Sequence, residues 1–318
     1  MTTETFWTEL QEERAKAVLA VVDDLKGYWP LTVRQIHYRL VETRPTWFKS
    51  SLKTPTPYEN TTRHSQDLSR VLKWMRIDHR LSWSVLTDRT RRVSPKRGFD
   101  DLQSFMDQEL SYFLDGYDRC LVQSQDVYVE LWVEKDALSS VFEDVADPCC
   151  LRVVTRRGYN SVTAEADYYQ RAKKEIGNGR KPVVLYFGDF DPSGNDMLRA
   201  SLNTLQNQMG LPELETVRVA LTKEQIESYG LPPKPGAAKK KDPRYKAYVK
   251  KHGTSAWELD ALHPRELSRI ARDAIQNTLD MENFEAEEAQ EEKDRVRLHQ
   301  FRDRIMGLIE KEMDWFLN

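Results

Sequence analysis

Carboxylate side chains directly follow two apolar segments of the chain. Glu134 comes after the β-rich run 127–133, and Asp189 and Asp191 come after the run 182–187. Residues i and i+2 of an extended segment project to the same side, so both aspartates can face one point. Converging carboxylates repel one another unless a cation lies among them, and all-oxygen ligation selects a hard ion. The sequence therefore predicts a Mg²⁺ site at Glu134, Asp189 and Asp191, with Mn²⁺ as a surrogate.

Two alternatives stay open for these acids. Asp189 and Asp191 would have a purely structural role if they capped the next helix and shaped the turn at 192–194. Glu258 and Asp260 repeat the same spacing further along the chain. They either approach the predicted site and support a second metal ion, or lie on a strand edge exposed to water.

Strands and helices that alternate with short connections must position these acids. Such an alternation predicts a parallel sheet covered by helices, with ligands at the carboxyl ends of the strands. The predicted strands are 127–133, 151–155, 182–187 and 217–221, and the predicted helices between them are 136–145, 161–176 and 195–209. The expected fold class is therefore α/β, and the acids lie where such a sheet binds its ligands.

The N-terminal region has a different pattern. Helical spacing of apolar residues predicts three helices, followed by a short strand and a charged turn. The segments are helices at 8–26, 32–44 and 61–80, a loop at 45–60, a strand at 83–87 and a turn at 88–92. This order is that of a winged helix-turn-helix domain, in which the last helix enters the major groove of DNA. An ordinary three-helix bundle is the alternative.

Charge is distributed unevenly along the chain. The whole protein has a formal net charge of -3, but residues 31–100 contain 15 Lys or Arg against 6 Asp or Glu. A basic block in an acidic protein predicts a polyanionic partner, here duplex DNA, although a solvated charged surface has the same composition. The candidate DNA contacts are Arg63, Arg70, Lys73, Arg76, Arg89, Arg91 and Arg92.

Length and composition limit the class of protein. A chain of 318 residues is too long for one small core. The expected parts are an N-terminal DNA-binding domain (1–100), a connecting helix (101–120), a catalytic domain (121–275) and a charged helical tail (276–318). No apolar run approaches the roughly 18 residues of a membrane span, and the first residues do not form a secretion signal. We therefore expect no membrane partner and a cytoplasmic protein.

The acidic motifs resemble those of a known family. Glu134 together with Asp189-Phe190-Asp191-Pro192-Ser193-Gly194 resembles the Toprim domain of topoisomerases, primases and some nucleases. Val-Glu-Lys-Asp-Ala-Leu at 133–138 and Thr-Arg-Arg-Gly-Tyr at 155–159 are similar to the topoisomerase VI A subunit and the related meiotic break-forming protein, including the compact forms carried by mobile elements and bacteria. The resemblance implies a winged-helix domain before a Toprim domain.

The resemblance also implies a nucleophile. The family's catalytic tyrosine lies in an Arg-Asp/Glu-Ile-Tyr-Tyr segment, which Arg34-Gln35-Ile36-His37-Tyr38 matches with Gln35 and His37 as departures. Tyr38 would then form a 5′-phosphotyrosyl link to DNA. Arg34, one helical turn earlier on the same face, would stabilise the reacting oxygen. The alternative is that Tyr38 is a core aromatic residue.

Partners and alternative activities follow from the same resemblance. A double-strand break would need a homodimer, with each Tyr38 acting on the Glu134, Asp189 and Asp191 of the opposite subunit. Strand passage would need an ATPase partner of the B-subunit type, because the chain lacks a Gly-x-x-x-x-Gly-Lys-Ser/Thr phosphate loop. A bacterial protein of this kind would associate with the nucleoid. The alternatives are a Toprim nuclease that uses metal-activated water, and a non-enzymatic DNA-binding module.

Overall fold

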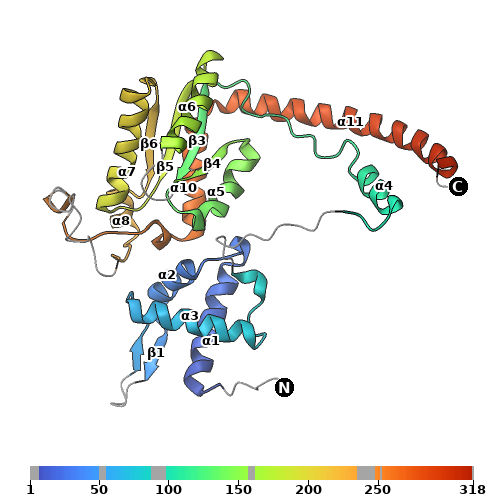
Figure 1. Ribbon diagram of the computed structural model, residues 1–318. Coiled ribbons are helices and arrows are strands. Elements are labelled where there is room, and N and C mark those ends of the chain that lie inside the picture. The colour runs from blue at the N-terminus through green and yellow to red at the C-terminus, as the bar shows by residue number, and fades with distance from the viewer. Residues whose placement is uncertain are drawn as a thin grey trace. The chain divides into compact units, whose positions relative to one another are not determined.

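The computed structural model describes residues 7–49, 55–86, 98–156, 162–234, 248–250 and 253–316 (Figure 1). The chain divides into two compact units. The first comprises Met1–Thr90 and Val127–Ile275, and the second comprises Arg91–Asp126 and Gln276–Asn318. The connecting helix and the charged tail, which the sequence analysis treats separately, thus belong to one unit. No helix among the described residues is long and apolar enough to cross a membrane.

A parallel sheet of four strands, in the order β4-β3-β5-β6, forms the centre of the larger part of the first unit. The strands are β3 (Val127–Val133), β4 (Arg152–Thr155), β5 (Lys181–Phe187) and β6 (Glu215–Ala220). All four predicted strands are present, so the α/β prediction is confirmed. The sequence could predict them because runs of β-branched and aromatic residues between helical segments are typical of buried parallel strands.

Helices connect the strands and cover the sheet. They are α5 (Ser139–Ala146), α6 (Val162–Gly177), α7 (Pro192–Leu202), α8 (Lys223–Ser228) and α10 (Pro264–Gln276). Tyr168 of α6 packs against Trp132 of β3 at a ring-centroid distance of 4.9 Å, and Phe142 of α5 packs against Phe187 of β5 at 4.5 Å. After α7 the helix continues as a π-helical segment, Asn203–Gln208. The motif at 155–159 is described only as far as Arg156, which pairs with the buried Glu165.

Three helices and a short hairpin form the N-terminal part of the first unit, around a core of their own. The helices are α1 (Glu9–Asp24), α2 (Val33–Thr43) and α3 (Thr62–Ile77), and the hairpin strands are β1 (Thr46–Lys49) and β2 (Pro55–Pro57). Threonine side chains cap all three helices, at Thr8, Thr32 and Thr61. The predicted helices are therefore confirmed, and their N-caps explain where they begin.

Two details of the predicted N-terminal domain are wrong. Residues 45–60 were expected to be a loop, but they contain β1 and β2, because the Trp47 indole is fully buried and donates a 2.9 Å hydrogen bond to Asp67 of α3. Of the predicted strand at 83–87, Trp83–Val85 form a 3₁₀ turn, Leu86 makes an isolated bridge to Leu31, and Thr87 lies outside the described residues. The antiparallel pair that the structure describes precedes α3. The predicted charged turn, with Arg89, Arg91 and Arg92, lies outside the described residues.

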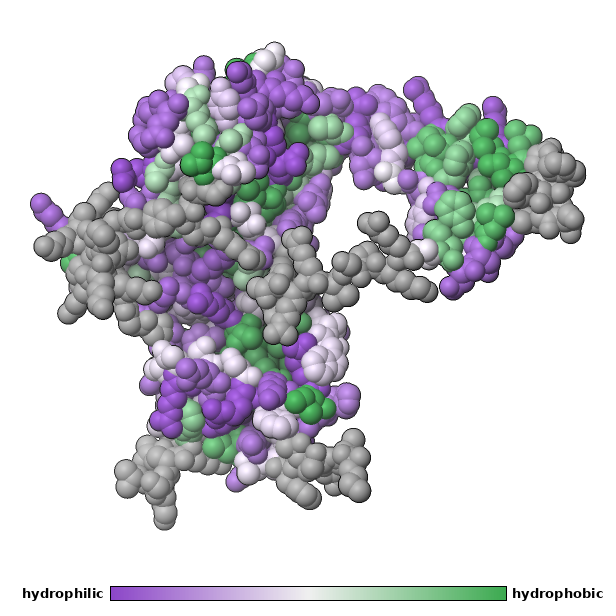
Figure 2. Space-filling view, in the orientation of Figure 1, coloured by the Kyte–Doolittle hydropathy of each residue, from purple (hydrophilic) through white to green (hydrophobic). Residues whose placement is uncertain are grey.

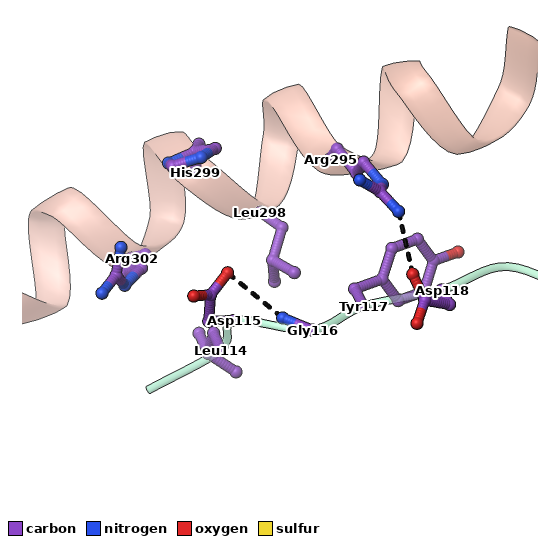
Figure 3. Close-up of a pocket in the computed structure, with 9 residues that line it drawn as sticks. All are labelled: Leu114, Asp115, Gly116, Tyr117, Asp118, Arg295, Leu298, His299 and Arg302. Carbon is purple, nitrogen blue, oxygen red and sulfur yellow. Dashed lines mark hydrogen bonds and ion pairs between the residues drawn. The ribbon is translucent and has the colours of Figure 1, made fainter. Parts of the chain in front are cut away.

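The second unit consists of α4 (Leu102–Ser111), an extended segment and the long helix α11 (Met281–Phe316). Arg119 of this segment forms ion pairs with two residues of α11, Glu287 at 2.5 Å and Asp294 at 3.2 Å. Residues 114–118 and α11 enclose a cavity of about 190 Å³, where Arg295 pairs with Asp118 (Figure 3). Apolar surface gathers over α4 and the C-terminal half of α11 (Figure 2). Its exposed members include Phe105, Phe301 and Leu308.

Candidate acid site at the carboxyl edge of the sheet

Parallel register brings the predicted acids to one edge of the sheet. Val133 of β3 lies opposite Phe187 of β5, and both strands end at these residues. Glu134 directly follows Val133, and Asp189 follows Phe187 after one glycine, so both acids leave the sheet at the same edge. The Asp189 backbone N–H donates a 2.9 Å hydrogen bond to Oε2 of Glu134, which joins the two strand ends directly.

Two glycines make room for the Glu134 carboxylate. A Cβ atom at Gly188 would lie 2.7 Å from Oε2 of Glu134, and one at Gly194 would lie 2.9 Å from the same atom. Both contacts are closer than a side chain allows, so the glycines are required by proximity. Local sequence patterns do not indicate this requirement for the two glycines.

Crowding of negative charge changes the ionisation of Glu134. Burial, followed by the charges of Asp189 and Asp191, raises the pKa of Glu134 from 4.5 to about 7. Burial also raises the pKa of Asp189. Glu134 is therefore a group that can gain or lose a proton near neutral pH.

This shift predicts that metal-free protein loses stability as the pH rises. The folded state binds the Glu134 proton more tightly than the unfolded chain, so the stabilisation is complete below the unfolded pKa of 4.5 and is lost as the pH rises through about 7. At about 1.4 kcal/mol per pKa unit, the loss is about 3 kcal/mol. Urea unfolding in EDTA, at about pH 5 and about pH 8, measures it.

The Glu134→Gln variant should lose correspondingly less stability over the same pH range. Glu213→Gln, which changes an exposed glutamate of the same unit, is the matched control and should behave like the wild type. Equal pH dependence in the wild type and in Glu134→Gln would contradict the assigned ionisation of Glu134.

Asp191 has a local backbone partner at the start of the next helix. Its Oδ1 accepts a 2.7 Å hydrogen bond from the Gly194 backbone and caps α7. Among the described residues, no group of three His, Cys, Asp or Glu side chains could hold a metal ion as arranged. The charges of Asp189 and Asp191 both act on Glu134, while Asp191 also has the helix-capping role that the sequence left open.

Asp189 instead belongs to a cluster with residues far along the chain. An isolated antiparallel bridge joins Phe190 to Trp257, and the Leu259 backbone donates a 2.8 Å hydrogen bond to Oδ1 of Asp189. These contacts bring Glu258 and Asp260, which are 4% and 1% exposed, to the carboxyl edge of the sheet. Of the two arrangements left open for this acidic pair, the structure has the one near the site.

A lysine ammonium lies at the centre of this cluster. Nζ of Lys135 is 2.6 Å from Oδ2 of Asp260, 2.9 Å from Oδ1 of Asp189 and 4.0 Å from Oε1 of Glu258. The carboxylates Asp189, Glu258 and Asp260 with the Lys135 ammonium are called the acid cluster below. Its members come from the ends of β3 and β5 and from the segment after Trp257.

Tyr38 and Arg34 both contact the acid cluster. The Tyr38 hydroxyl donates a 2.9 Å hydrogen bond to Oε2 of Glu258, and Nη1 of Arg34 lies 3.0 Å from Oε1. Burial and then the Glu258 charge raise the pKa of Tyr38 above its ordinary value. Burial opposes ionisation of Glu258, but Lys135, Arg34 and Lys234 outweigh it and lower the pKa of Glu258 to about 2.

The surroundings of Tyr38 combine a core and a cavity. Its side chain is 3% exposed, and its ring meets the His37 ring at a centroid distance of 5.3 Å. His37 is hydrogen-bonded to Tyr58 at 2.6 Å and to Asn60 at 3.0 Å, so this departure from the family's motif has its own structural partners. Tyr38 also lines a cavity of about 400 Å³ together with Arg39, Tyr229, Leu262 and His263.

The predicted DNA contacts of α3 lie partly on its outer surface. Arg63, Arg70 and Lys73 are exposed, whereas Arg76 is half-buried with its guanidinium 4.3 Å from the centroid of the Trp83 ring. Arg70 pairs with Asp67 one turn earlier at 3.2 Å. The exposed members can meet phosphates without rearrangement of the core.

Three cations of the site were not found from the sequence. Lys135 directly follows Glu134, and that position at a strand end was the available signal. Lys234 lies 2.8 Å from Oε1 of Glu258, in a proline-rich segment far along the chain from both strand ends. Arg218 donates hydrogen bonds to the carbonyl oxygens of Gly188 and Asp189, a backbone role that no sequence pattern indicates.

Comparison of this chain with models of protein families, with curated proteins and with solved structures finds no match.

Proposed function

We propose that this protein is a Mg²⁺-dependent DNA-cleaving enzyme of the type that the topoisomerase VI A subunit represents, with Tyr38 as its nucleophile. The observation that carries the proposal is the shared carboxylate: Tyr38 and Arg34 both bind Glu258 of the acid cluster. A tyrosine, a cation and clustered acids are the groups that a phosphoryl transfer to tyrosine requires. The domain order implied by the family resemblance, winged helix and then Toprim, is part of the proposal.

Among the described residues, no three carboxylates of the site could hold a metal ion as arranged, and the Lys135 ammonium lies between two of them, so a divalent cation would have to take its place. Oδ1 of Asp260 is buried and has no hydrogen-bond partner among the described residues, so it is free to act as a ligand. Asp189, Glu258 and Asp260 would hold the ion, with Glu134 at the adjacent strand end. When bound, Mg²⁺ supplies charge neutralisation at the scissile phosphate.

The protein's own groups would divide the remaining chemistry. Attack by the Tyr38 oxygen forms a phosphotyrosyl bond and breaks the bond to the 3′-oxygen of the neighbouring nucleotide. Glu258 orients the Tyr38 hydroxyl and accepts its proton as the bond to phosphorus forms, and Arg34 stabilises the developing phenolate. Glu134, with its pKa of about 7, is the group suited to pass a proton to the leaving 3′-oxygen.

Incubation with supercoiled plasmid and Mg²⁺ or Mn²⁺ tests the proposal. We expect nicked or linear DNA whose 5′ ends carry covalently bound protein, detected after denaturation and protease treatment. Cleavage without protein-linked ends would contradict a tyrosine nucleophile. Absence of any metal-dependent cleavage would leave a DNA-binding module.

A nuclease that uses metal-activated water is the second candidate. It is favoured by the burial of Tyr38 and by the hydrogen bond that occupies its hydroxyl. In that case Tyr38 is structural and Glu134 is the group that takes the proton from the attacking water. Free 5′-phosphate ends would identify this alternative.

DNA binding is expected to use the exposed basic face of α3. Replacing Arg63, Arg70 and Lys73 by Ala should weaken binding similarly for all sequences. Each lost phosphate contact should flatten the log–log salt dependence of the binding constant by about 0.9. Fluorescence anisotropy with labelled duplexes at several salt concentrations measures the slope.

The chain offers a matched control for this prediction. Arg199 of α7 is exposed like Arg70, and it too pairs with an aspartate three residues earlier, Asp196. Arg199→Ala should leave the salt slope unchanged, whereas Arg70→Ala should reduce it. If the two variants behave alike, the basic face of α3 does not contact DNA.

The expected partners remain part of the proposal. Two tyrosines would have to act for a double-strand break, which is why a homodimer is expected, and strand passage would need a separate ATPase subunit. The contact of Tyr38 with Glu258 joins the two groups within one chain and supports a site built from a single subunit. A homodimer would then hold two such sites side by side.

A further inference from the structure

We infer that Lys135 is the internal cation of a divalent-metal site formed by Asp189, Glu258 and Asp260, and that a metal ion binds there by displacing the Lys135 ammonium. The inference rests on the acid site of the proposed function and specifies how that site is controlled. Its test reads metal binding and lysine exposure instead of DNA cleavage, so the two proposals can fail separately.

The first observation is the position of the Lys135 ammonium. Nζ of Lys135 lies within 3 Å of carboxylate oxygens from both Asp189 and Asp260, which approach it from different segments of the chain. Arg34 and Lys234 bind Glu258 at 3.0 Å and 2.8 Å. Lys135 is thus the cation shared by the two aspartates.

The second observation is a carboxylate oxygen of Asp260 that lacks a hydrogen-bond partner among the described residues. Asp260 is 1% exposed, yet its Oδ1 has no hydrogen-bond partner among the described residues, although Oδ2 binds Lys135. A buried carboxylate oxygen without a partner is unfavourable, because it has lost its hydration. A lysine ammonium satisfies only one oxygen of this carboxylate, whereas a divalent cation brings two charges and further coordination positions.

The geometry of Lys135 permits displacement. The Lys135 side chain is 18% exposed, whereas the Asp260 side chain is wholly enclosed. A lysine has a flexible four-carbon stem and a compact charge, and it can move outward without unfolding the strand end. Once displaced, the Lys135 ammonium would face the solvent, where a DNA phosphate could bind it.

Metal binding by the variant Lys135→Met is the central experiment. Methionine approximates the four-carbon stem of lysine and lacks its ammonium. Mn²⁺ affinity, measured by calorimetry on the full chain without DNA, should rise by about tenfold or more over the wild type, which corresponds to about 1.4 kcal/mol. Lys234→Met, which removes a cation that contacts Glu258 but neither aspartate, should raise the affinity much less.

A second substitution connects the effect to the assigned ligands. Adding Asp260→Asn to Lys135→Met should abolish the gain in Mn²⁺ affinity. The inference is overturned if Lys135→Met binds Mn²⁺ no more tightly than the wild type, or if the gain persists without the Asp260 carboxylate.

The wild-type protein provides a test that needs no variant. Acetylation of lysines by an amine-reactive ester, followed by mass spectrometry, should modify Lys135 slowly in EDTA because its ammonium is paired. Saturating Mn²⁺ should speed modification of Lys135 severalfold and leave Lys181, which pairs with Glu215 on the surface, unchanged. Unchanged labelling of Lys135 at a Mn²⁺ concentration that calorimetry shows to be saturating would overturn displacement.

Discussion

The Tyr38→Phe variant is expected to form no protein-linked DNA ends and to cleave DNA more slowly by a factor of about 10³ or more. The substitution removes only the hydroxyl, and the ring keeps its packing against His37. Glu258 loses one hydrogen bond but retains Arg34 and Lys234 as partners, so the acid cluster should stay assembled. Denaturing gels of end-labelled DNA with and without protease measure the covalent link.

A control hydroxyl in the same region separates chemistry from stability. Tyr58 is fully buried and hydrogen-bonded to His37, so Tyr58→Phe also removes one buried hydroxyl near α2. That variant should keep the covalent link even if it is less stable. If Tyr38→Phe cleaves DNA at the wild-type rate, the water-based nuclease mechanism replaces the tyrosine mechanism.

The Asp189→Ala variant should abolish cleavage by either mechanism and retain most of the DNA affinity. Asp189 accepts a hydrogen bond from the Leu259 backbone and forms an ion pair with Lys135, whereas the proposed phosphate contacts lie on α3. Loss of a carboxylate from a metal site removes catalysis, and contacts to the DNA backbone persist. Plasmid cleavage and anisotropy on the same preparation measure the two properties. Full cleavage by this variant would contradict the acid site.

Mixing two inactive variants tests whether one chain builds the whole site. In a heterodimer of Tyr38→Phe with Asp189→Ala, a site shared between subunits would recombine an intact tyrosine with an intact acid cluster and restore nicking. The contact between Tyr38 and Glu258 in one chain leads us to expect no restored nicking. Co-purification of differently tagged subunits must show that heterodimers form. Restored nicks would show that Tyr38 acts on the opposite subunit.

The sheet and the strand-end acids could be predicted because their signals are local. Apolar runs of strand length, separated by helical segments, indicate a parallel sheet, and the carboxyl ends of its strands must share one edge. That reasoning placed Glu134 and Asp189 correctly at one edge. The N-terminal helices followed from the helical spacing of their apolar residues, whereas β1 was missed because Trp47 finds its hydrogen-bond partner, Asp67, on another element.

The sequence by itself thus determined the elements, the edge of the sheet that carries the acids and the residue types available there. Only the tertiary structure decided which acids act together. Asp191 is drawn to the backbone of α7, and the bridge between Phe190 and Trp257 brings Asp260 to Asp189 across about seventy residues of sequence. The same folding places Lys135 between two aspartates and Tyr38 against Glu258. Local patterns cannot determine such pairings, because long-range contacts depend on how separate segments pack.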